Sequence, residues 1–475
     1  MTEILNKTKI LATIGPSSDS EDNLKKLIDT GVSGFRLNFS HGTEEYFESL
    51  FKRIYQVCEE RKLPIPILQD LQGPKIRIGK LEFDEIEIVT GELIEITVDD
   101  VIGNKEIIST SYKDLVNDSA IGDEILINDG LIKLKVAEKK DKSVVCNILE
   151  GGILRPKKGM NLPGMQLTTE SITEKDKSDM EFAFQHRVDY VALSFVRSAE
   201  DIISLRKWME ERGFNKQIVA KIEKPEAVEN FEEILEVSDA IMVARGDLGV
   251  ELGSYQIPVI QKRIIRRCNE VGKLVITATQ MLESMINNPT PTRAESTDVA
   301  NAVLDGSDVV MLSGETAAGK YPVESVRTMR NLILQTESQD QFKPIIDWDS
   351  PKDIADNIFD ATCRAFVDIS NQIKAKALIV FTHEGRKAKN LSKFNPDTYI
   401  YAFSDSFETL NDLNLHKGIK PFYIKNIMDE DFYIKKAKEK LIKNTLISTG
   451  DLVIFTAGAP ISDVNRKNWI RFLVV

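Results

Sequence analysis

Charged and hydroxyl side chains recur where apolar, β-type runs of this sequence end. The candidate site residues of this kind are Arg36, Asn38, Ser40, Asp70, Lys221, Glu223, Asp247 and Thr279. Lys221 and Glu223 are two residues apart, so on a strand both would lie on one face, opposite Ile222. The same alternation would bring Arg36, Asn38 and Ser40 to one face. Such a gathering of cations and carboxylates is typical of a site that binds a metal ion and an anionic substrate.

Two of these residues are candidate metal ligands. Glu223 and Asp247 offer hard carboxylate oxygens, and the chain has only four histidines. This favours Mg²⁺ or Mn²⁺ over zinc. A purely structural network of ion pairs is the alternative, although so many buried charges without a ligand would be costly.

Two other motifs are weaker candidates for a catalytic or binding site. Residues 314–320 (GETAAGK) nearly fit a phosphate-binding P-loop, but Tyr321 stands where a Ser or Thr should bind Mg²⁺. Ser313 and Glu315 are better explained as residues that support the site. His41 is a lone histidine, and we expect it to be structural.

The elements that must position these residues alternate between strands and helices. The expected strands cover 10–14, 35–39, 65–69, 190–194, 217–222, 240–243, 273–277 and 308–312. Eight strands separated by helical patterns predict a (β/α)₈ barrel, in which catalytic groups follow the carboxyl ends of the strands. A doubly wound parallel sheet has the same rhythm and is the alternative.

The rhythm is interrupted once and is followed by a further unit. Residues 75–163 alternate apolar and polar residues, contain an Asp129-Gly130 hairpin signal and show no amphipathic helix. We therefore expect a small all-β domain at 72–164, inserted after the third strand of a barrel that covers 1–71 and 165–340. Residues 341–475 resume an open α/β pattern and form the last expected domain, with a possible effector site.

Composition excludes several classes of protein. The 475 residues include 62 Lys and Arg against 74 Asp and Glu, a net charge of −12, which argues against nucleic acid or anionic membranes as partners. No apolar run approaches the roughly 20 residues of a membrane span, and the first residues lack a signal-peptide core. The four cysteines lie far apart, without a C-x-x-C pair. We expect a cytoplasmic enzyme.

Several motifs resemble those of the pyruvate kinase family, in the family's order. They are TKILATIGP at 8–16, RLNFSHG at 36–42, QDLQGPKIR at 69–77, KKGMNLPG at 157–164, KIE at 221–223, MVARGDLGV at 242–250, ATQMLES at 278–284 and SGETA at 313–317. The inserted β domain and the C-terminal α/β unit also match that family's architecture. The resemblance implies transfer of the phosphoryl group of phosphoenolpyruvate to ADP, giving pyruvate and ATP, the last step of glycolysis.

The resemblance also implies residue roles. Glu223 and Asp247 would hold Mg²⁺, and Arg36 and Lys221 would contact the phosphoryl group. The backbone at Gly246 and Asp247 and the Thr279 hydroxyl would receive the carboxylate end of the substrate. Lys221 would also stabilise the enolate, and Thr279 would protonate it through a water. The nucleotide phosphates would meet Arg77 and the lid residue Lys158.

One departure from the family concerns K⁺. Asn38, Ser40 and Asp70 match side chains that bind a monovalent cation in many members. Members that need K⁺ usually have Glu where this chain has Lys75, and Thr and Lys where it has Leu71 and Gln72. We therefore expect that K⁺ is not required, because the Lys75 ammonium replaces it. The alternative is that Lys75 points into solvent.

The resemblance leaves quaternary structure and regulation less defined. Family members are usually tetrameric, so we expect a homotetramer. Relatives often bind a phosphorylated effector at the loop matching 382–386, but His383, Glu384 and Lys387 depart from the usual pattern there. Two other functions compete: a different Mg²⁺-dependent barrel enzyme acting on phosphoenolpyruvate or pyruvate, and a non-catalytic ligand-binding relative.

Overall fold

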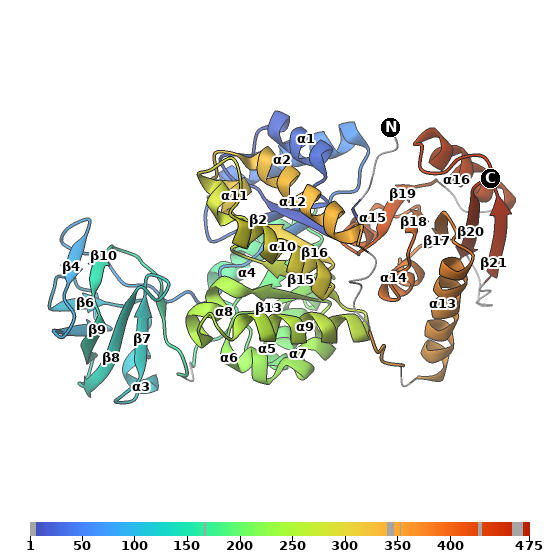
Figure 1. Cartoon of the computed structure of the whole chain (residues 1–475). Helices are drawn as coiled ribbons and strands as arrows, with labels where there is room; N and C mark the ends of the chain where they lie inside the picture. Colours follow the sequence, from blue (N-terminus) through green and yellow to red (C-terminus); the bar gives the residue numbers. More distant parts are fainter. Residues whose placement is uncertain (1–5, 166–167, 340–345, 352, 426–429, 458–468) are drawn as a thin grey trace.

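The computed structural model describes residues 6–165, 168–339, 346–351, 353–425, 430–457 and 469–475. A closed barrel lies at the centre, with the inserted β sheets on one side and the C-terminal sheet on the other (Figure 1). In this part of the chain no helix is long and apolar enough to cross a membrane.

The barrel has the eight parallel strands expected from the sequence. They are β1 (Lys9–Thr13), β2 (Gly34–Asn38), β3 (Ile67–Asp70), β12 (Tyr190–Leu193), β13 (Gln217–Ile222), β14 (Ala240–Ala244), β15 (Leu274–Ala278) and β16 (Val309–Leu312). The strands close in the order β1-β16-β15-β14-β13-β12-β3-β2. The prediction of a (β/α)₈ barrel is confirmed, and the doubly wound alternative is wrong.

Helices surround the barrel and bury their apolar faces on it. They are α1 (Glu21–Thr30), α2 (Glu44–Arg61), α4 (Glu174–Phe184), α5 (Ala199–Glu210), α6 (Pro225–Glu229), α7 (Phe231–Val237), α8 (Arg245–Leu252), α9 (Ile257–Val271), α10 (Arg293–Asp305), α11 (Gly314–Ala317) and α12 (Pro322–Glu337), with a 3₁₀ turn at Glu283–Ile286. The first helix, α1, has a side-chain cap at its N-terminus. The cap is Ser20, whose side chain accepts a hydrogen bond from the Asn23 N–H, while Ser18 bonds to Gly15.

The inserted segment forms two antiparallel-rich sheets with their own core. Its strands are β4 (Ile86–Ile88), β5 (Leu93–Thr97), β6 (Ile107–Ser109), β7 (Glu124–Ile127), β8 (Ile132–Lys139), β9 (Ser143–Glu150), β10 (Gly152–Leu154) and β11 (Met160–Asn161). The hairpin predicted at Asp129-Gly130 joins β7 to β8. Asn128, Asp129 and Gly130 all have positive φ, which explains the Asn-Asp-Gly sequence of this turn. One short helix, α3 (Leu115–Asp118), corrects the expectation of an all-β unit.

The C-terminal unit is a five-stranded sheet in the order β19-β18-β17-β20-β21. Its elements are α13 (Ile354–Gln372), β17 (Ala377–Phe381), α14 (Arg386–Lys393), β18 (Tyr399–Ser404), α15 (Phe407–Leu413), β19 (Ile419–Tyr423), α16 (Glu430–Lys443), β20 (Leu452–Ala457) and β21 (Trp469–Val474). The antiparallel edge strand β21 was not predicted from the sequence. The Asn414 side chain, just after α15, donates to the carbonyls of Ser33 and Pro64 and so ties this unit to the barrel.

Candidate active site

A chain of ion pairs crosses the carboxyl end of the barrel. Arg36 on β2 donates from Nε to Asp70 Oδ2 at 2.7 Å. Asp70, at the end of β3, lies with Oδ1 3.2 Å from Lys221 Nζ on β13. Lys221 Nζ is also 3.3 Å from Glu223 Oε2. Asp70 and Glu223 are each only 1% exposed, so this is a buried, charge-balanced cluster.

The charges of the cluster control one another's protonation. Burial alone would lower the pKa of Lys221, but Asp70, Glu223 and Asp247 raise it above its usual value. Burial would raise the pKa of Asp70, but Lys221 and Arg36 lower it. Burial raises the pKa of Glu223, with Lys221 opposing the shift. Lys221 is therefore a fixed cation at neutral pH.

Two members of the cluster were missed from the sequence. The Ser194 hydroxyl, just after β12, accepts from Lys221 Nζ at 2.6 Å and donates to the Leu71 carbonyl at 2.7 Å. The Phe195 N–H donates to Glu223 Oε1 at 2.7 Å. A serine directly after a barrel strand was the available signal, because polar groups at that position face the mouth of the barrel.

The two predicted metal ligands occupy different elements. Glu223 follows β13, and Asp247 lies in the first turn of α8. Glu223 Oε2 is buried and accepts no hydrogen bond from the described residues, which suits a metal ligand. Within those residues no group of three or more His, Cys, Asp or Glu side chains is arranged to hold a metal ion. Two carboxylates with the rest of the shell open are the donor set that Mg²⁺ commonly uses beside phosphate groups.

Thr279 lies after β15 in an unusual backbone conformation. Its φ is +65° and that of Gln280 is +53°. A β-branched residue rarely adopts this left-handed region. The Thr279 hydroxyl accepts from the Gly246 N–H at 2.8 Å. The residues predicted to receive a carboxylate are therefore bonded to each other.

The residues predicted to surround a monovalent cation are partly engaged by protein groups. Asn38 Oδ1 accepts from the Ser40 N–H at 3.1 Å, and both Asp70 oxygens form ion pairs. Strand β2 ends at Asn38 and Ser40 lies in the turn that follows, so strand alternation does not extend to Ser40 as predicted. Lys75 is exposed, and it lines a small pocket together with Asp247.

The candidate nucleotide residues lie where the inserted domain joins the barrel. Arg77 Nη1 donates to the Lys157 carbonyl at 3.0 Å, and the Lys158 carbonyl accepts from the Ile78 N–H. His41 is exposed. Partial burial, and then the charges of Arg77, Lys75 and Arg36, lower its pKa, so positive charge gathers here.

Residues of the near-P-loop motif support the loops of the candidate site, as the sequence suggested. Glu315 in α11 accepts from the Leu282 N–H at 3.0 Å and from the Ser313 N–H at 2.7 Å. It therefore joins the loops after β15 and β16. The Ser313 hydroxyl is buried and makes no hydrogen bond to the described residues.

Comparison with known proteins decides which family uses this arrangement. The family model "Pyruvate kinase, barrel domain" matches residues 5–326, and "Pyruvate kinase, alpha/beta domain" matches residues 360–473. This chain belongs to the pyruvate kinase family. It is thereby an enzyme, a phosphotransferase of glycolysis.

Similar proteins match almost the whole of this chain. Pyruvate kinases from Staphylococcus aureus strains MRSA252 and USA300 are each 40% identical over 473 residues, which cover 99% of this chain and 81% of theirs. A crystal structure of a pyruvate kinase from Cryptosporidium parvum superposes with a TM-score of 0.90 at 37% identity, covering 99% of this chain and 96% of that one.

Proposed function

We propose that this enzyme transfers the phosphoryl group of phosphoenolpyruvate to ADP, giving pyruvate and ATP in the cytoplasm. The observation that carries the proposal is the buried cluster of Arg36, Lys221, Asp70 and Glu223 at the barrel mouth. Phosphoryl transfer needs cations fixed around the equatorial oxygens and little covalent work by the protein. A cluster already held by ion pairs supplies such cations without reorganisation.

In this proposal Arg36 and Lys221 bind the phosphoryl group. The Gly246 backbone, the Asp247 N–H and the Thr279 hydroxyl receive the substrate carboxylate. Lys221 then stabilises the enolate because its charge stands where negative charge develops. Thr279 passes a proton to the enolate through a water.

Glu223 and Asp247 are the residues that would hold Mg²⁺ or Mn²⁺. When bound, the metal would neutralise charge on the substrate oxygens. Glu223 Oε2 is buried and accepts no hydrogen bond from the described residues, its neighbour being the Lys221 ammonium at 3.3 Å, and this supports the assignment. Arg77 and Lys158 would hold the nucleotide phosphates from the side of the inserted domain.

The test is release of pyruvate from phosphoenolpyruvate, with and without ADP. Pyruvate and ATP formed together, only with ADP and Mg²⁺, would support the proposal. Conversion of phosphoenolpyruvate without ADP would favour a mutase or lyase. Binding without conversion would favour a non-catalytic relative.

We further propose that the enzyme does not require K⁺. Lys75 is an exposed cation near the pocket that Asp247 lines, and the Asp70 oxygens are already paired with Lys221 and Arg36. A tethered ammonium saves the entropic cost of capturing a free ion. We expect activity in tetramethylammonium buffer, at constant ionic strength, to change little when KCl is omitted. A fall of about tenfold, or about 1.4 kcal/mol, would contradict the proposal.

A pair of charge-reversal variants sharpens this test. Lys75→Glu should lower activity in tetramethylammonium buffer, and added K⁺ should restore part of it. Lys80→Glu is the matched control, because Lys80 is also exposed and the change in net charge is identical. If the two variants behave alike, the effect belongs to net charge and not to position 75.

The inserted domain is proposed to close as a lid. Its two connections contain Gly73 and Gly164, with φ of +64° and +74°, a conformation that favours glycine. Asn161 on β11 donates to Glu251 Oε1 on α8 at 3.0 Å, and this polar contact joins lid and barrel. We expect Mg²⁺ and ADP to slow hydrogen exchange around 157–162 and to reduce the radius of gyration. Identical behaviour with and without ligands would rule out closure.

We also propose a homotetramer. Ile354 and Ile358 on α13 are 77% and 63% exposed, and Tyr255 and Val259 near the start of α9 are 81% and 73% exposed. Exposed apolar groups of this kind mark protein contacts. Sedimentation measures the state directly, and a monomer at assay concentration would overturn the proposal.

We also propose an effector site at 382–386. The loop precedes α14, where helix N–H groups favour an anion. However, His383 Nδ1 pairs with Asp405 at 2.8 Å, and the buried Lys387 donates to the Ala457 carbonyl at 2.7 Å. A change in phosphoenolpyruvate saturation on adding phosphorylated sugars would identify an effector.

A further inference from the structure

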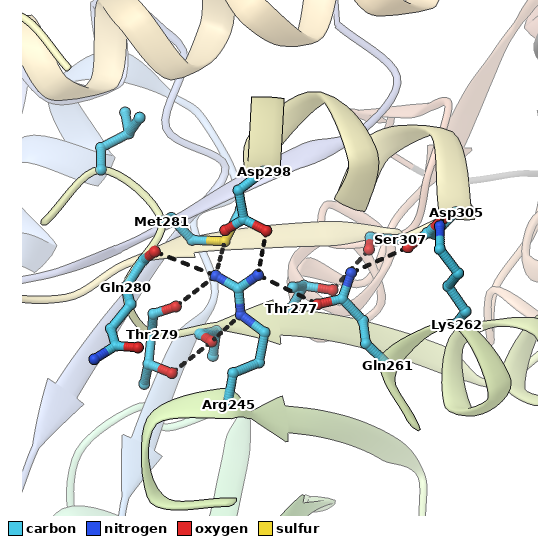
Figure 2. A network of polar contacts seen from close by, with 12 residues as sticks. Arg245, Gln261, Lys262, Thr277, Thr279, Gln280, Met281, Asp298, Asp305 and Ser307 are labelled. Carbon is cyan, nitrogen blue, oxygen red and sulfur yellow. Dashed lines mark hydrogen bonds and ion pairs between the residues drawn. The ribbon is translucent and has the colours of Figure 1, made fainter. Parts of the chain in front are cut away.

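Arg245 is a buried cation that the proposed reaction does not use. It follows β14 and begins α8, next to Gly246 and Asp247, and it is only 8% exposed. Its guanidinium reaches sideways to the end of the neighbouring strand β15, where it lies at the centre of a polar network (Figure 2). A buried guanidinium left unpaired would be costly, so its many partners are needed to hold it in place.

One side of the guanidinium binds three successive carbonyls of the loop after β15. Nε donates to the Ala278 carbonyl at 3.2 Å, and Nη2 donates to those of Thr279 at 2.7 Å and Gln280 at 3.3 Å. Met281 Sδ lies 2.9 Å from the same Nη2. Only a planar fork with several fixed donors can serve three carbonyls at once.

The other side of the guanidinium is anchored to two helices. Nη1 donates to Asp298 Oδ1 on α10 at 2.7 Å and to Gln261 Oε1 on α9 at 3.2 Å. Gln261 in turn donates to Asp305 Oδ2 at 3.0 Å. The orientation of Arg245 is therefore set by the helices outside the barrel.

The bound loop has a strained backbone. Thr279 and Gln280 both have left-handed φ, although neither is glycine. Such a conformation persists only where surrounding contacts enforce it. The three carbonyl contacts of Arg245 are those contacts, since they fix the peptide groups on both sides of Thr279.

A second bond closes a ring between the two loops. Arg245 donates to the Thr279 carbonyl. Gly246, which follows Arg245 in the chain, donates from its N–H to the Thr279 hydroxyl at 2.8 Å. The start of α8 and the loop after β15 are thus fixed relative to each other. A Cβ at Gly246 would lie 3.4 Å from Thr279 Oγ1, so the two segments are in close contact.

We propose that Arg245 is a positioning residue, whose guanidinium holds the Thr279 hydroxyl and the Gly246 backbone in the arrangement that receives the carboxylate end of the substrate. It acts through these two residues and does not touch the substrate. This inference rests on the proposed function, because it needs Thr279 and Gly246 to bind the carboxylate.

Steady-state kinetics of Arg245→Lys test the inference. Lysine keeps the charge but its single ammonium cannot bind three carbonyls and Asp298 together. We expect KM for phosphoenolpyruvate to rise and kcat to fall, each by about tenfold, or about 1.4 kcal/mol. KM for ADP should stay within about twofold, because the nucleotide residues lie elsewhere. A parallel rise of both KM values would mean a general loss of structure and would overturn the inference.

Arg206→Lys is the matched control. Arg206 also donates to a main-chain carbonyl, that of Val237, and to a carboxylate, Asp239, but at the opposite end of the barrel. It should alter thermal stability without separating the two KM values. If Arg245→Lys does not fold, Asp298→Asn replaces it. Asp298 is 35% exposed in its side chain, so that variant removes the anchor with less disturbance and should raise KM for phosphoenolpyruvate alone.

The proposed function and the positioning role of Arg245 can be overturned separately. A parent enzyme that forms no pyruvate from phosphoenolpyruvate and ADP would overturn the proposed function. The positioning role alone would be overturned if the parent is active and its Arg245→Lys and Asp298→Asn variants keep kcat and KM for phosphoenolpyruvate within about twofold.

Discussion

Replacing Lys221 with Met should lower kcat by about a thousandfold or more, or about 4 kcal/mol of activation free energy. The Lys221 ammonium is held by the Ser194 hydroxyl at 2.6 Å and by Asp70 and Glu223 at 3.2 and 3.3 Å. It is therefore fixed before substrate arrives. Methionine keeps the volume but removes the charge that would meet the transferring phosphoryl group and the enolate.

The same variant should bind phosphoenolpyruvate almost as well as the parent. In the proposal Arg36 remains to bind the phosphoryl group, and Gly246 and Thr279 remain to receive the carboxylate. A loss confined to kcat would indicate an interaction made in the transition state. If kcat stayed within about tenfold of the parent, another group would be doing this work.

Lys9→Met is the control for removing a buried lysine. Lys9 begins β1 at the opposite end of the barrel, and burial lowers its pKa to about 7. Its ammonium donates to the Ile419 carbonyl of the C-terminal unit. The change should affect stability and leave kcat within about twofold. A large loss of kcat in both variants would show that the assay reports folding.

The barrel could be predicted because its strands are buried on both faces. Such strands read as short apolar runs, as for Val309–Leu312, and eight of them fit one closed architecture. Strand β21 was missed because half of its residues point to solvent and Trp469, Arg471 and Phe472 give no clear alternation. Its place at the sheet edge depends on pairing with β20, which no local pattern encodes.

The charged centre of the site was also accessible from the sequence. Lys221, Glu223 and Asp70 end barrel strands, so topology alone brings them together. Ser194 and Arg245 were not found, because their roles come from contacts between different strands. Lys221 reaches Ser194 across from β13 to β12, and Arg245 reaches the loop after β15. These contacts depend on side-chain direction, which spacing does not determine.

The direction of the Lys75 side chain is likewise not determined by the sequence. The sequence identifies a reversal of charge relative to K⁺-dependent relatives, but it does not say where the Lys75 side chain points. Lys75 is exposed beside the pocket that Asp247 lines, and it is not bonded to Asp70. A long, flexible lysine can still approach a bound anion, so the K⁺ assay and not the apo geometry decides its role.

Glu223→Gln should raise the Mg²⁺ concentration needed for half-maximal activity by at least about tenfold, because loss even of groups that support metal ligands has effects of that size. The glutamine carbonyl can still accept the Phe195 N–H that Glu223 Oε1 now accepts at 2.7 Å, so the local fold should survive. What is lost is the buried, negatively charged Oε2. Binding of Mn²⁺, followed by its paramagnetic signal without substrates, should weaken by the same factor.

Glu251→Gln is the matched control for this change. Glu251 is equally buried, lies 2.6 Å from Lys224, and also has an Oε2 that accepts no hydrogen bond from the described residues. Its Oε1 accepts from the lid residue Asn161 and it is not a proposed metal ligand, so its variant should keep the Mn²⁺ affinity within about twofold. Equal weakening in both variants would reflect the loss of any buried negative charge. Parent-like Mn²⁺ binding in Glu223→Gln would place the metal elsewhere, because a carboxylate ligand cannot be neutralised without cost.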